Sequence, residues 1–207
     1  MFFDGLYGGT FDPIHLGHCF AAERVRQAFH MKAVRMVLSA NPPHKEAKSE
    51  NIRHRWEMLE LACEGYPNLV PDDSEIRWGS SYTIDTLKSF NEAHDASNFF
   101  WILGQDSFVT LPEWKDWRQI LHHCSLIVVD RSIDSGLVAK HKERLLKESR
   151  ATKNAGESVG RICLLDLEMP EISSSDIRKR LREGDSTEGL LDSKVAAYIA
   201  DHELYCL

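Results

Sequence analysis

The sequence predicts an α/β protein in which an open, doubly wound parallel sheet carries helices on both faces. Short apolar runs alternate along the 207 residues with segments of helical spacing, and this alternation is typical of βαβ units. Two runs, FFWIL at 99–103 and LIVV at 126–129, have no polar break, as expected of strands buried on both faces. Ligands of such sheets bind beyond the carboxyl ends of the strands. We therefore expect the functional residues at that edge.

The predicted strands and helices alternate in chain order. The strands cover residues 1–7, 34–39, 69–71 with 74–78, 98–103, 125–129 and 161–165. Between them, apolar residues recur every three or four positions, which predicts helices. The stripes are Ala21, Val25, Ala28 and Phe29; then Ile52, Trp56, Leu59 and Cys63; then Ile84 and Leu87.

Residues 132–160 differ in composition from the rest of the chain. They are rich in charged residues and glycine and contain few large apolar side chains. We predict an amphipathic helix over 137–147 followed by a loop, forming a solvated excursion from a single domain. The core of that domain would comprise residues 1–131 and 161–182, with a small C-terminal helical portion at 183–207.

Composition and charge exclude several classes of protein. A formal net charge of −7 argues against non-specific binding to nucleic acid over a broad basic face. The five cysteines are scattered and form no CxxC pair, so neither a disulfide framework nor structural zinc is predicted. We find no apolar stretch long enough for a membrane span and no secretory pattern at the N-terminus. These features predict a cytoplasmic protein and leave its oligomeric state open.

Residues 8–18, GGTFDPIHLGH, form the most informative motif. The adjacent Gly8 and Gly9 let the backbone approach a ligand closely or adopt positive φ. His15 and His18 share one face if the turn between them is helical. A helix that begins after such a turn directs free N–H groups at an anion such as phosphate. The plainer alternative is a tight βα turn with two surface histidines.

The second motif, ISSSDIRKRL at 172–181, predicts a helix that begins with its own cap. Ser173 as N-cap places Asp176 at the third helical position, and isoleucines occupy the hydrophobic-staple positions. Arg178 and Arg182 lie one turn apart. Taken alone, this is a well-capped basic surface helix. Paired with the glycine-rich motif, it is typical of the opposite wall of a polyphosphate site, in which Arg178 holds the outer phosphates.

A third motif, NPPHK at 41–45, follows the second predicted strand. Two prolines fix a rigid extended turn, which would hold His44 and Lys45 at the sheet edge. An ordinary proline loop with exposed polar residues is the alternative. The adjacent His122 and His123 lack a ligand pattern around them, and no protein metal site is predicted.

Together, the HxGH of the first motif and the distant ISSSDIR resemble the nucleotidyltransferase superfamily, which shares a Rossmann-like fold with class I aminoacyl-tRNA synthetases. Within it, the chain resembles the bacterial nicotinate-nucleotide adenylyltransferases. The closer likeness rests on NPPHK at 41–45, SYT at 81–83 with DTL at 85–87, LGQDS at 103–107, and Trp114.

The resemblance implies two groups of binding residues. ATP would lie against Gly8, Gly9, Thr10, Phe11, His15, His18, Ser174 and Arg178, with His44 and Lys45 near its phosphates. The pyridine mononucleotide would lie against Asn41, Thr83, Gly104, Asp106, Trp114 and Arg131. Trp114 can stack on the pyridine ring, and Asp106 can accept hydrogen bonds from ribose hydroxyls. In the family an aromatic residue often follows this tryptophan. Lys115 stands there instead, where it could help neutralise the nicotinate carboxylate or point to water.

The implied reaction joins ATP to nicotinate mononucleotide, giving nicotinate adenine dinucleotide and pyrophosphate, a step of NAD biosynthesis. The attacking group is the substrate's own phosphate, whose second pKa of ~6 leaves it largely dianionic at neutral pH. Neither a general base nor a side-chain nucleophile is needed. His15, His18, Lys45 and Arg178 would align the anions and stabilise the leaving pyrophosphate, with Mg²⁺ bound mainly through the ATP phosphates.

Two other functions are compatible with the same motifs. One is a related nucleotidyltransferase that uses nicotinamide mononucleotide or phosphopantetheine as acceptor. The other is a non-catalytic nucleotide-sensing module, although both histidines and Arg178 are present. A dehydrogenase is set aside because the first turn reads GGTFDP and not GxGxxG.

Overall fold

The protein is described here by a computed structural model. It describes residues 4–40, 52–93, 99–130, 135–150, 160–168 and 171–206. Four of the predicted site residues, Asn41, His44, Lys45 and Arg131, lie outside these ranges.

All six described strands are parallel and form one sheet in the order β3-β2-β1-β4-β5-β6. They are β1 (Asp4–Gly9), β2 (Val34–Leu38), β3 (Leu69–Asp72), β4 (Phe99–Gly104), β5 (Ser125–Asp130) and β6 (Ile162–Asp166). β1 pairs with β2 on one side and β4 on the other. The direction of chain progression therefore reverses between β1 and β4, which is where doubly wound sheets bind ligands. The predicted Rossmann-like fold is confirmed.

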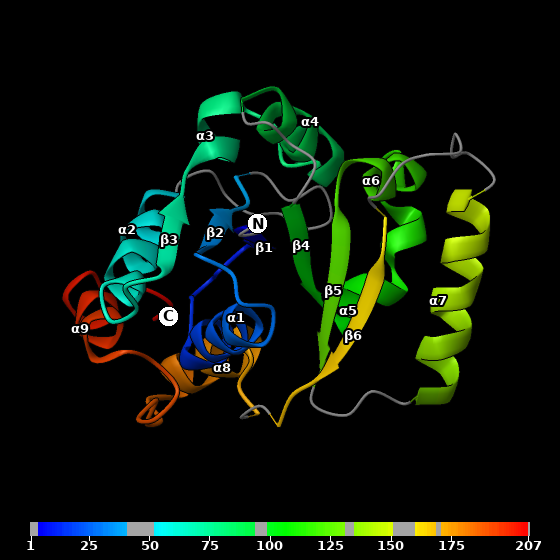
Figure 1. The fold of residues 1–207 in the computed structure, drawn as a ribbon. Coiled ribbons are helices and arrows are strands. Elements are labelled where there is room, and N and C mark those ends of the chain that lie inside the picture. Colours follow the sequence, from blue (N-terminus) through cyan, green and yellow to red (C-terminus); the bar gives the residue numbers. More distant parts are fainter. Residues whose placement is uncertain are drawn as a thin grey trace.

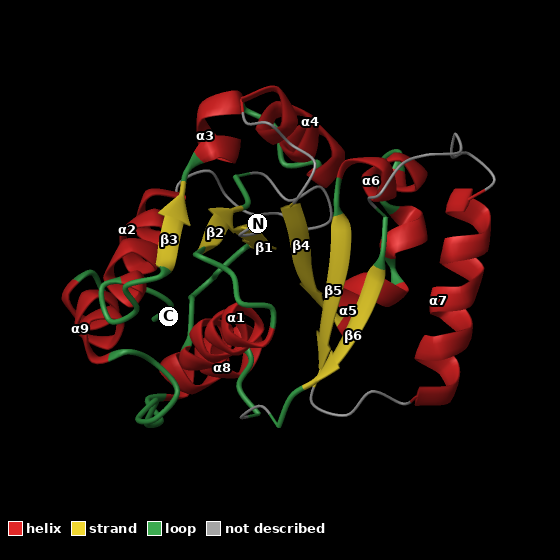
Figure 2. Cartoon of the chain, in the orientation of Figure 1, coloured by secondary structure: helices red, strands yellow, loops and turns green. Residues whose placement is uncertain are grey.

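Helices cover both faces of the sheet (Figures 1 and 2). The described helices are α1 (Leu16–Ala28), α2 (Ile52–Cys63), α3 (Ser74–Trp78), α4 (Thr83–Ala93), α5 (Gln105–Val109), the 3-10 helix η2 (Leu111–Glu113), α6 (Trp117–His123), α7 (Ser135–Arg150), α8 (Ser174–Glu183) and α9 (Ser193–Asp201). None of these helices is long and apolar enough to span a membrane. One core cluster packs α1, α2, α8 and α9 against the sheet, and a second packs α4, α5, α6 and α7.

The strand predicted at 74–78 is wrong, because these residues form the short helix α3. The alternation of polar and apolar residues in SEIRW fits a strand, but the flanking residues turn the chain. The side chain of Asp72 accepts a hydrogen bond from the backbone N–H of Ser74 at 2.9 Å. Gly79 then ends the helix with φ at +67°, a left-handed conformation that glycine adopts without strain. Local hydrogen bonding therefore overrides the period of the side chains.

The helix predicted over 137–147 is present as α7, three residues longer at its C-terminal end and two at its N-terminal end. It is more than a solvated excursion, because Leu145 is fully buried in the second core cluster. Arg118 of α6 pairs with Glu148 of α7 at 3.1 Å, and His141 contacts the carbonyl of Phe108 at 3.1 Å. The loop predicted to follow lies largely outside the described residues.

Candidate active site

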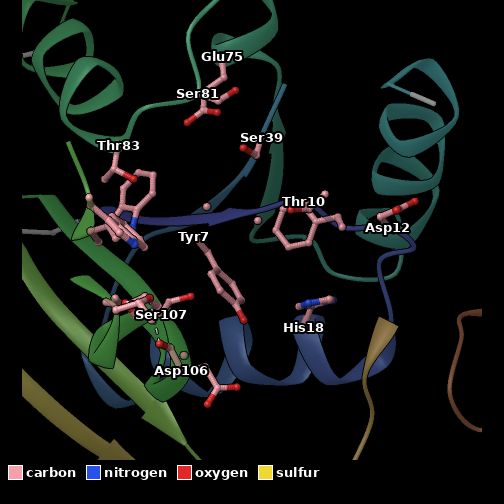
Figure 3. A pocket seen from close by; sticks show the side chains of 18 of the residues that line it. Tyr7, Thr10, Asp12, His18, Ser39, Glu75, Ser81, Thr83, Asp106 and Ser107 are labelled. Atoms are coloured by element: carbon pink, nitrogen blue, oxygen red, sulfur yellow. Dashed lines mark hydrogen bonds between the residues drawn. The ribbon is translucent and has the colours of Figure 1, made fainter. Parts of the chain in front are cut away.

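A cavity of about 940 Å³ lies at the carboxyl ends of β1 and β4. Its volume is near the upper end of the ~300–1,000 Å³ typical of small-molecule sites. Figure 3 shows its extent, with Thr83 and Asp106 toward one end, Tyr7 in the middle and Asp12 at the other end. After the ligands that the sequence resemblance implies for them, we call these the acceptor end and the phosphate end. Of the predicted residues, the lining includes Gly8, Gly9, Thr10, Phe11, His18, Thr83, Gly104, Asp106, Trp114, Ser174 and Arg178.

The two glycines of the first motif are required by neighbouring rings of the protein itself. A Cβ atom on Gly8 would lie 2.4 Å from the ring of Trp101, and one on Gly9 would lie 2.5 Å from the ring of Phe11. Neither glycine has positive φ; the left-handed residue of the turn is Phe11, at +46°. Of the two alternatives for these glycines, positive φ is not adopted; the close packing of Trp101 and Phe11 is what excludes a side chain.

His15 and His18 play different parts at the phosphate end. His18 lines the cavity, whereas His15 is only 6% exposed and is the N-cap of α1. The backbone N–H of His15 donates to Nδ1 of His18 at 3.3 Å. That bond requires a lone pair on Nδ1, so the proton of the neutral His18 ring is on Nε2. Gly17 leaves room for His15, because a Cβ there would lie 3.1 Å from the His15 ring.

The two end motifs of the chain converge on this same corner. Ser173 caps α8 by accepting from the backbone N–H of Asp176 at 3.1 Å, as predicted. The hydroxyl of Ser174 donates to the carbonyl of Pro13 at 3.0 Å. Arg178 Nη1 donates to the carbonyl of Asp12 at 2.5 Å. Segments more than 160 positions apart are therefore joined by direct hydrogen bonds.

A buried arginine, which sequence reasoning missed, fastens the turn after β1 to the end of β2. Arg55 of α2 is 1% exposed. Its guanidinium donates to the carbonyls of Thr10 at 2.9 Å, Ser39 at 2.8 Å and Ala40 at 3.2 Å. Burial lowers the pKa of Arg55. In the sequence, Arg55 stands within the apolar stripe of its helix, which is the one signal that could have revealed it.

The acceptor end is built from the starts of short helices. Thr83 begins α4, and Gly104 is the N-cap of α5, whose first turn carries Asp106. Trp114 follows η2 and is half-buried against the second core cluster. An aromatic ring, a carboxylate and helix N-termini thus face one space. This set can stack on a flat ring, accept from hydroxyls and donate backbone N–H groups to an anion.

Comparisons with known proteins decide the family. Residues 6–180 match the model of the cytidylyltransferase-like family. Relatives named probable nicotinate-nucleotide adenylyltransferase include one from Geotalea daltonii, 37% identical over 214 residues and covering 97% of both chains. Another, from Trichormus variabilis, is 36% identical over 201 residues, covering 97% of this chain and 95% of its own.

This chain belongs to the cytidylyltransferase-like family. Within the family its full-length likeness is to the nicotinate-nucleotide adenylyltransferases. The fold agrees with solved structures of the Plasmodium falciparum nicotinic acid mononucleotide adenylyltransferase, at 20% identity. The complex with NaAD gives a TM-score of 0.76 and covers 99% of this chain and 98% of its own. The complex with APC gives 0.72, covering 98% and 96%.

In this family member, the side chain of Lys115 is exposed to solvent and is paired with a carboxylate of the protein. Its ammonium group contacts both carboxylate oxygens of Asp85, at 3.0 and 3.3 Å, and lies 4.7 Å from the ring centre of Tyr82. Ser80 donates to the same carboxylate at 3.0 Å. Lys115 therefore links the segment after Trp114 to the first turn of α4.

Glu75 is a second residue that sequence reasoning missed. It lines the cavity and is only 3% exposed. Thr86 of α4 donates to its carboxyl at 2.8 Å. Burial raises the pKa of Glu75 to about 7, although hydrogen bonds from Thr86 and Ser81 act in the opposite direction. The hydrogen bond between Glu75 and Thr86 joins α3 to α4.

Proposed function

We propose that this chain transfers the AMP group of ATP to nicotinate mononucleotide, giving nicotinate adenine dinucleotide and pyrophosphate. The observation that carries the proposal is the convergence of Ser174 and Arg178 on the turn at 10–13, beside His18, in one dinucleotide-sized cavity. Relatives that match over their full length at 33–37% identity are named probable nicotinate-nucleotide adenylyltransferase. Their name supports nicotinate mononucleotide as the acceptor.

The chemistry needs alignment more than proton transfer. A phosphate oxygen of the mononucleotide forms a bond to the α-phosphorus of ATP, and the bond from that phosphorus to the bridging α,β-oxygen breaks. The leaving pyrophosphate takes the electron pair and its negative charge. Because the attacking phosphate is already largely dianionic at neutral pH, no side chain has to accept a proton. The protein's task is to bring two anions together and to stabilise the charge that develops.

We assign that task to the phosphate end. The Nε2–H of His18 would donate to a phosphate oxygen, since its Nδ1 already accepts from the backbone of His15. Arg178 would offer a planar set of N–H donors to the outer phosphates, while Ser174 and the turn at 8–11 surround the triphosphate. His15 would act by holding His18. His44 and Lys45 complete this group on the strength of the sequence motif.

At the acceptor end, Trp114 would stack on the pyridine ring and Asp106 would accept from the ribose hydroxyls. Thr83 and Gly104 stand at helix N-termini, where backbone N–H groups suit the nicotinate carboxylate. Asn41 and Arg131 are assigned to the mononucleotide by the family pattern.

We propose that Mg²⁺ enters with ATP. Within the described ranges, no group of three or more His, Cys, Asp or Glu side chains could hold a metal ion. The described polar side chains at the phosphate end are a guanidinium, an imidazole, hydroxyls and the carboxylate of Asp12. Such a set fits an ion that is held mainly by phosphate oxygens and water, as Mg²⁺ usually is in nucleotide sites. When bound, the ion would neutralise part of the triphosphate charge.

The test is a pyrophosphate-release assay with ATP, Mg²⁺ and a panel of acceptors. Nicotinate mononucleotide should give the highest kcat/KM, above nicotinamide mononucleotide, and phosphopantetheine should give none. A higher kcat/KM with nicotinamide mononucleotide or phosphopantetheine would contradict the proposed substrate and identify that compound as the acceptor. No pyrophosphate with any acceptor, together with measurable ATP binding, would favour a nucleotide-sensing module.

A further inference from the structure

The end of the chain returns to the phosphate end of the cavity. After α9, the backbone N–H of Leu204 donates to the carbonyl of Ile199 at 3.0 Å and closes the helix. Glu203 and Tyr205 then adopt positive φ, at +50° and +64°. Left-handed backbone at non-glycine residues costs on the order of 1 kcal/mol and persists where other contacts hold it. This turn points the side chain of Tyr205 back into the molecule.

The contact that the turn makes is with the loop after β1. The hydroxyl of Tyr205 donates to Oδ1 of Asp12 at 2.7 Å, across 193 positions of sequence. Burial, reinforced by the charge of Asp12, raises the pKa of the Tyr205 hydroxyl, against the opposing effect of Arg178 and Arg55. The phenol therefore keeps its proton at neutral pH and remains a donor.

Asp12 also faces the arginine of the second motif. Its backbone carbonyl accepts from Arg178 Nη1 at 2.5 Å, but its Oδ2 lies 3.9 Å from that nitrogen, beyond hydrogen-bond length. Arg178 and Asp12 are both about 30% exposed and both line the cavity. A carboxylate free to rotate beside a guanidinium would form a close two-bond pair with it. Such a pair would occupy donors that the triphosphate needs.

We propose that Tyr205 is a positioning residue for ATP, which restrains the Asp12 carboxylate and thereby keeps the Arg178 guanidinium available to phosphate. The inference rests on the proposed function, since it assigns Arg178 to the triphosphate. It adds the C-terminal turn, from Glu203 to Tyr205, to the parts of the chain that shape the site.

The experiment compares full-length wild type, Tyr205→Phe, Asp12→Asn and the double variant Tyr205→Phe/Asp12→Asn. Tyr66→Phe is the matched control, because Tyr66, like Tyr205, is half-buried against the first core cluster and lies outside the cavity lining. ATP affinity is measured by calorimetry without acceptor, and KM and kcat by pyrophosphate release. Melting temperatures accompany each variant.

Tyr205→Phe should weaken ATP binding about fivefold. A loss of this size corresponds to the removal of one hydrogen bond, here the bond that restrains the Asp12 carboxylate. The KM of the mononucleotide should stay within about twofold. Asp12→Asn in the same chain should restore ATP affinity, since an amide cannot neutralise Arg178. If Tyr205 had a merely structural role, Tyr205→Phe would lower the melting temperature, and adding Asp12→Asn would not restore ATP affinity.

Two results would overturn the inference: unchanged ATP affinity in Tyr205→Phe, or a double variant that binds ATP no better than Tyr205→Phe alone. The proposed function fails separately, if wild type releases no pyrophosphate with nicotinate mononucleotide. ATP calorimetry still decides the role of Tyr205 in that case, because it does not depend on the acceptor.

Discussion

The imidazole rings of His15 and His18 are stacked, with ring centres 3.6 Å apart and planes inclined by 20°. The ring of Phe11 meets His18 edge-on at 5.1 Å. The His18 ring is therefore held by contacts with two neighbouring rings and by the hydrogen bond from the backbone of His15 to Nδ1. Its remaining nitrogen is thus oriented before substrate arrives, which is the condition under which a hydrogen-bond donor stabilises a transition state most.

Replacing His18 with Ala should lower kcat by about 10²- to 10³-fold, the usual effect of removing a preorganised donor to developing charge. The KM of the mononucleotide should change by less than about twofold, because the contacts proposed for its pyridine ring and ribose are at the other end of the cavity. Steady-state kinetics with both substrates varied would measure the two effects. His30→Ala is the control, since His30 is an exposed histidine in the turn after α1. An unchanged kcat in His18→Ala would remove this residue from the mechanism.

Lys115→Met should raise the KM of the mononucleotide by about two- to fivefold and leave the KM of ATP unchanged. The reason is that the exposed pair with Asp85 contributes only about 0–1 kcal/mol but joins the segment after Trp114 to the first turn of α4. The preference for acid over amide should persist, because Asp85 already neutralises the ammonium group.

Added salt screens the pair in the wild type, so it should narrow the difference in mononucleotide KM between wild type and Lys115→Met. The control is Arg53→Met, which breaks a comparable exposed pair with Glu57. If Lys115→Met abolishes the preference for nicotinate, the lysine contacts the substrate carboxylate directly.

Glu75→Gln should change how stability depends on pH. Burial raises the pKa of Glu75 from 4.5 to about 7, so between these values the unfolded chain loses the proton while the folded protein keeps it. The wild type therefore loses stability as pH rises through this window, by at most about 3 kcal/mol. Glutamine has no proton to lose.

Urea unfolding of both proteins from pH 5 to pH 8 measures this effect. The free energy of unfolding of Glu75→Gln, relative to wild type, should increase across the series. Glu64→Gln, at an exposed carboxylate, should follow the wild-type curve in that range. Parallel curves for wild type and Glu75→Gln would show that the buried carboxyl is ionised throughout.

Arg55→Met should lower the free energy of unfolding by about 3 kcal/mol or more, because it leaves three carbonyls at the ends of β1 and β2 without their donor. Urea denaturation measures the loss. Arg24→Met, at an exposed position of α1, should cost less than about 0.5 kcal/mol. Equal losses for the two variants would mean that other groups satisfy these carbonyls.

Local patterns carried much of the fold prediction. Apolar runs identified β4 and β5 closely, because a strand buried on both faces has to be apolar along its length. The cap of α8 was also predictable, since Ser173 and Asp176 bond within one turn. The helix at 74–78 was missed, because the side chain that turns the chain there, Asp72, stands outside the alternating segment.

By itself, the sequence determined the parallel sheet, the two motifs that meet at the cavity and the family, because each depends on residues close together along the chain. Only the tertiary structure decided which side chains reach one another across long separations. Arg55 against Thr10, Lys115 against Asp85, and Tyr205 against Asp12 are joined by packing of distant elements. Such contacts leave no periodic signal, because a single polar side chain looks the same in sequence whether it meets water or a partner far along the chain.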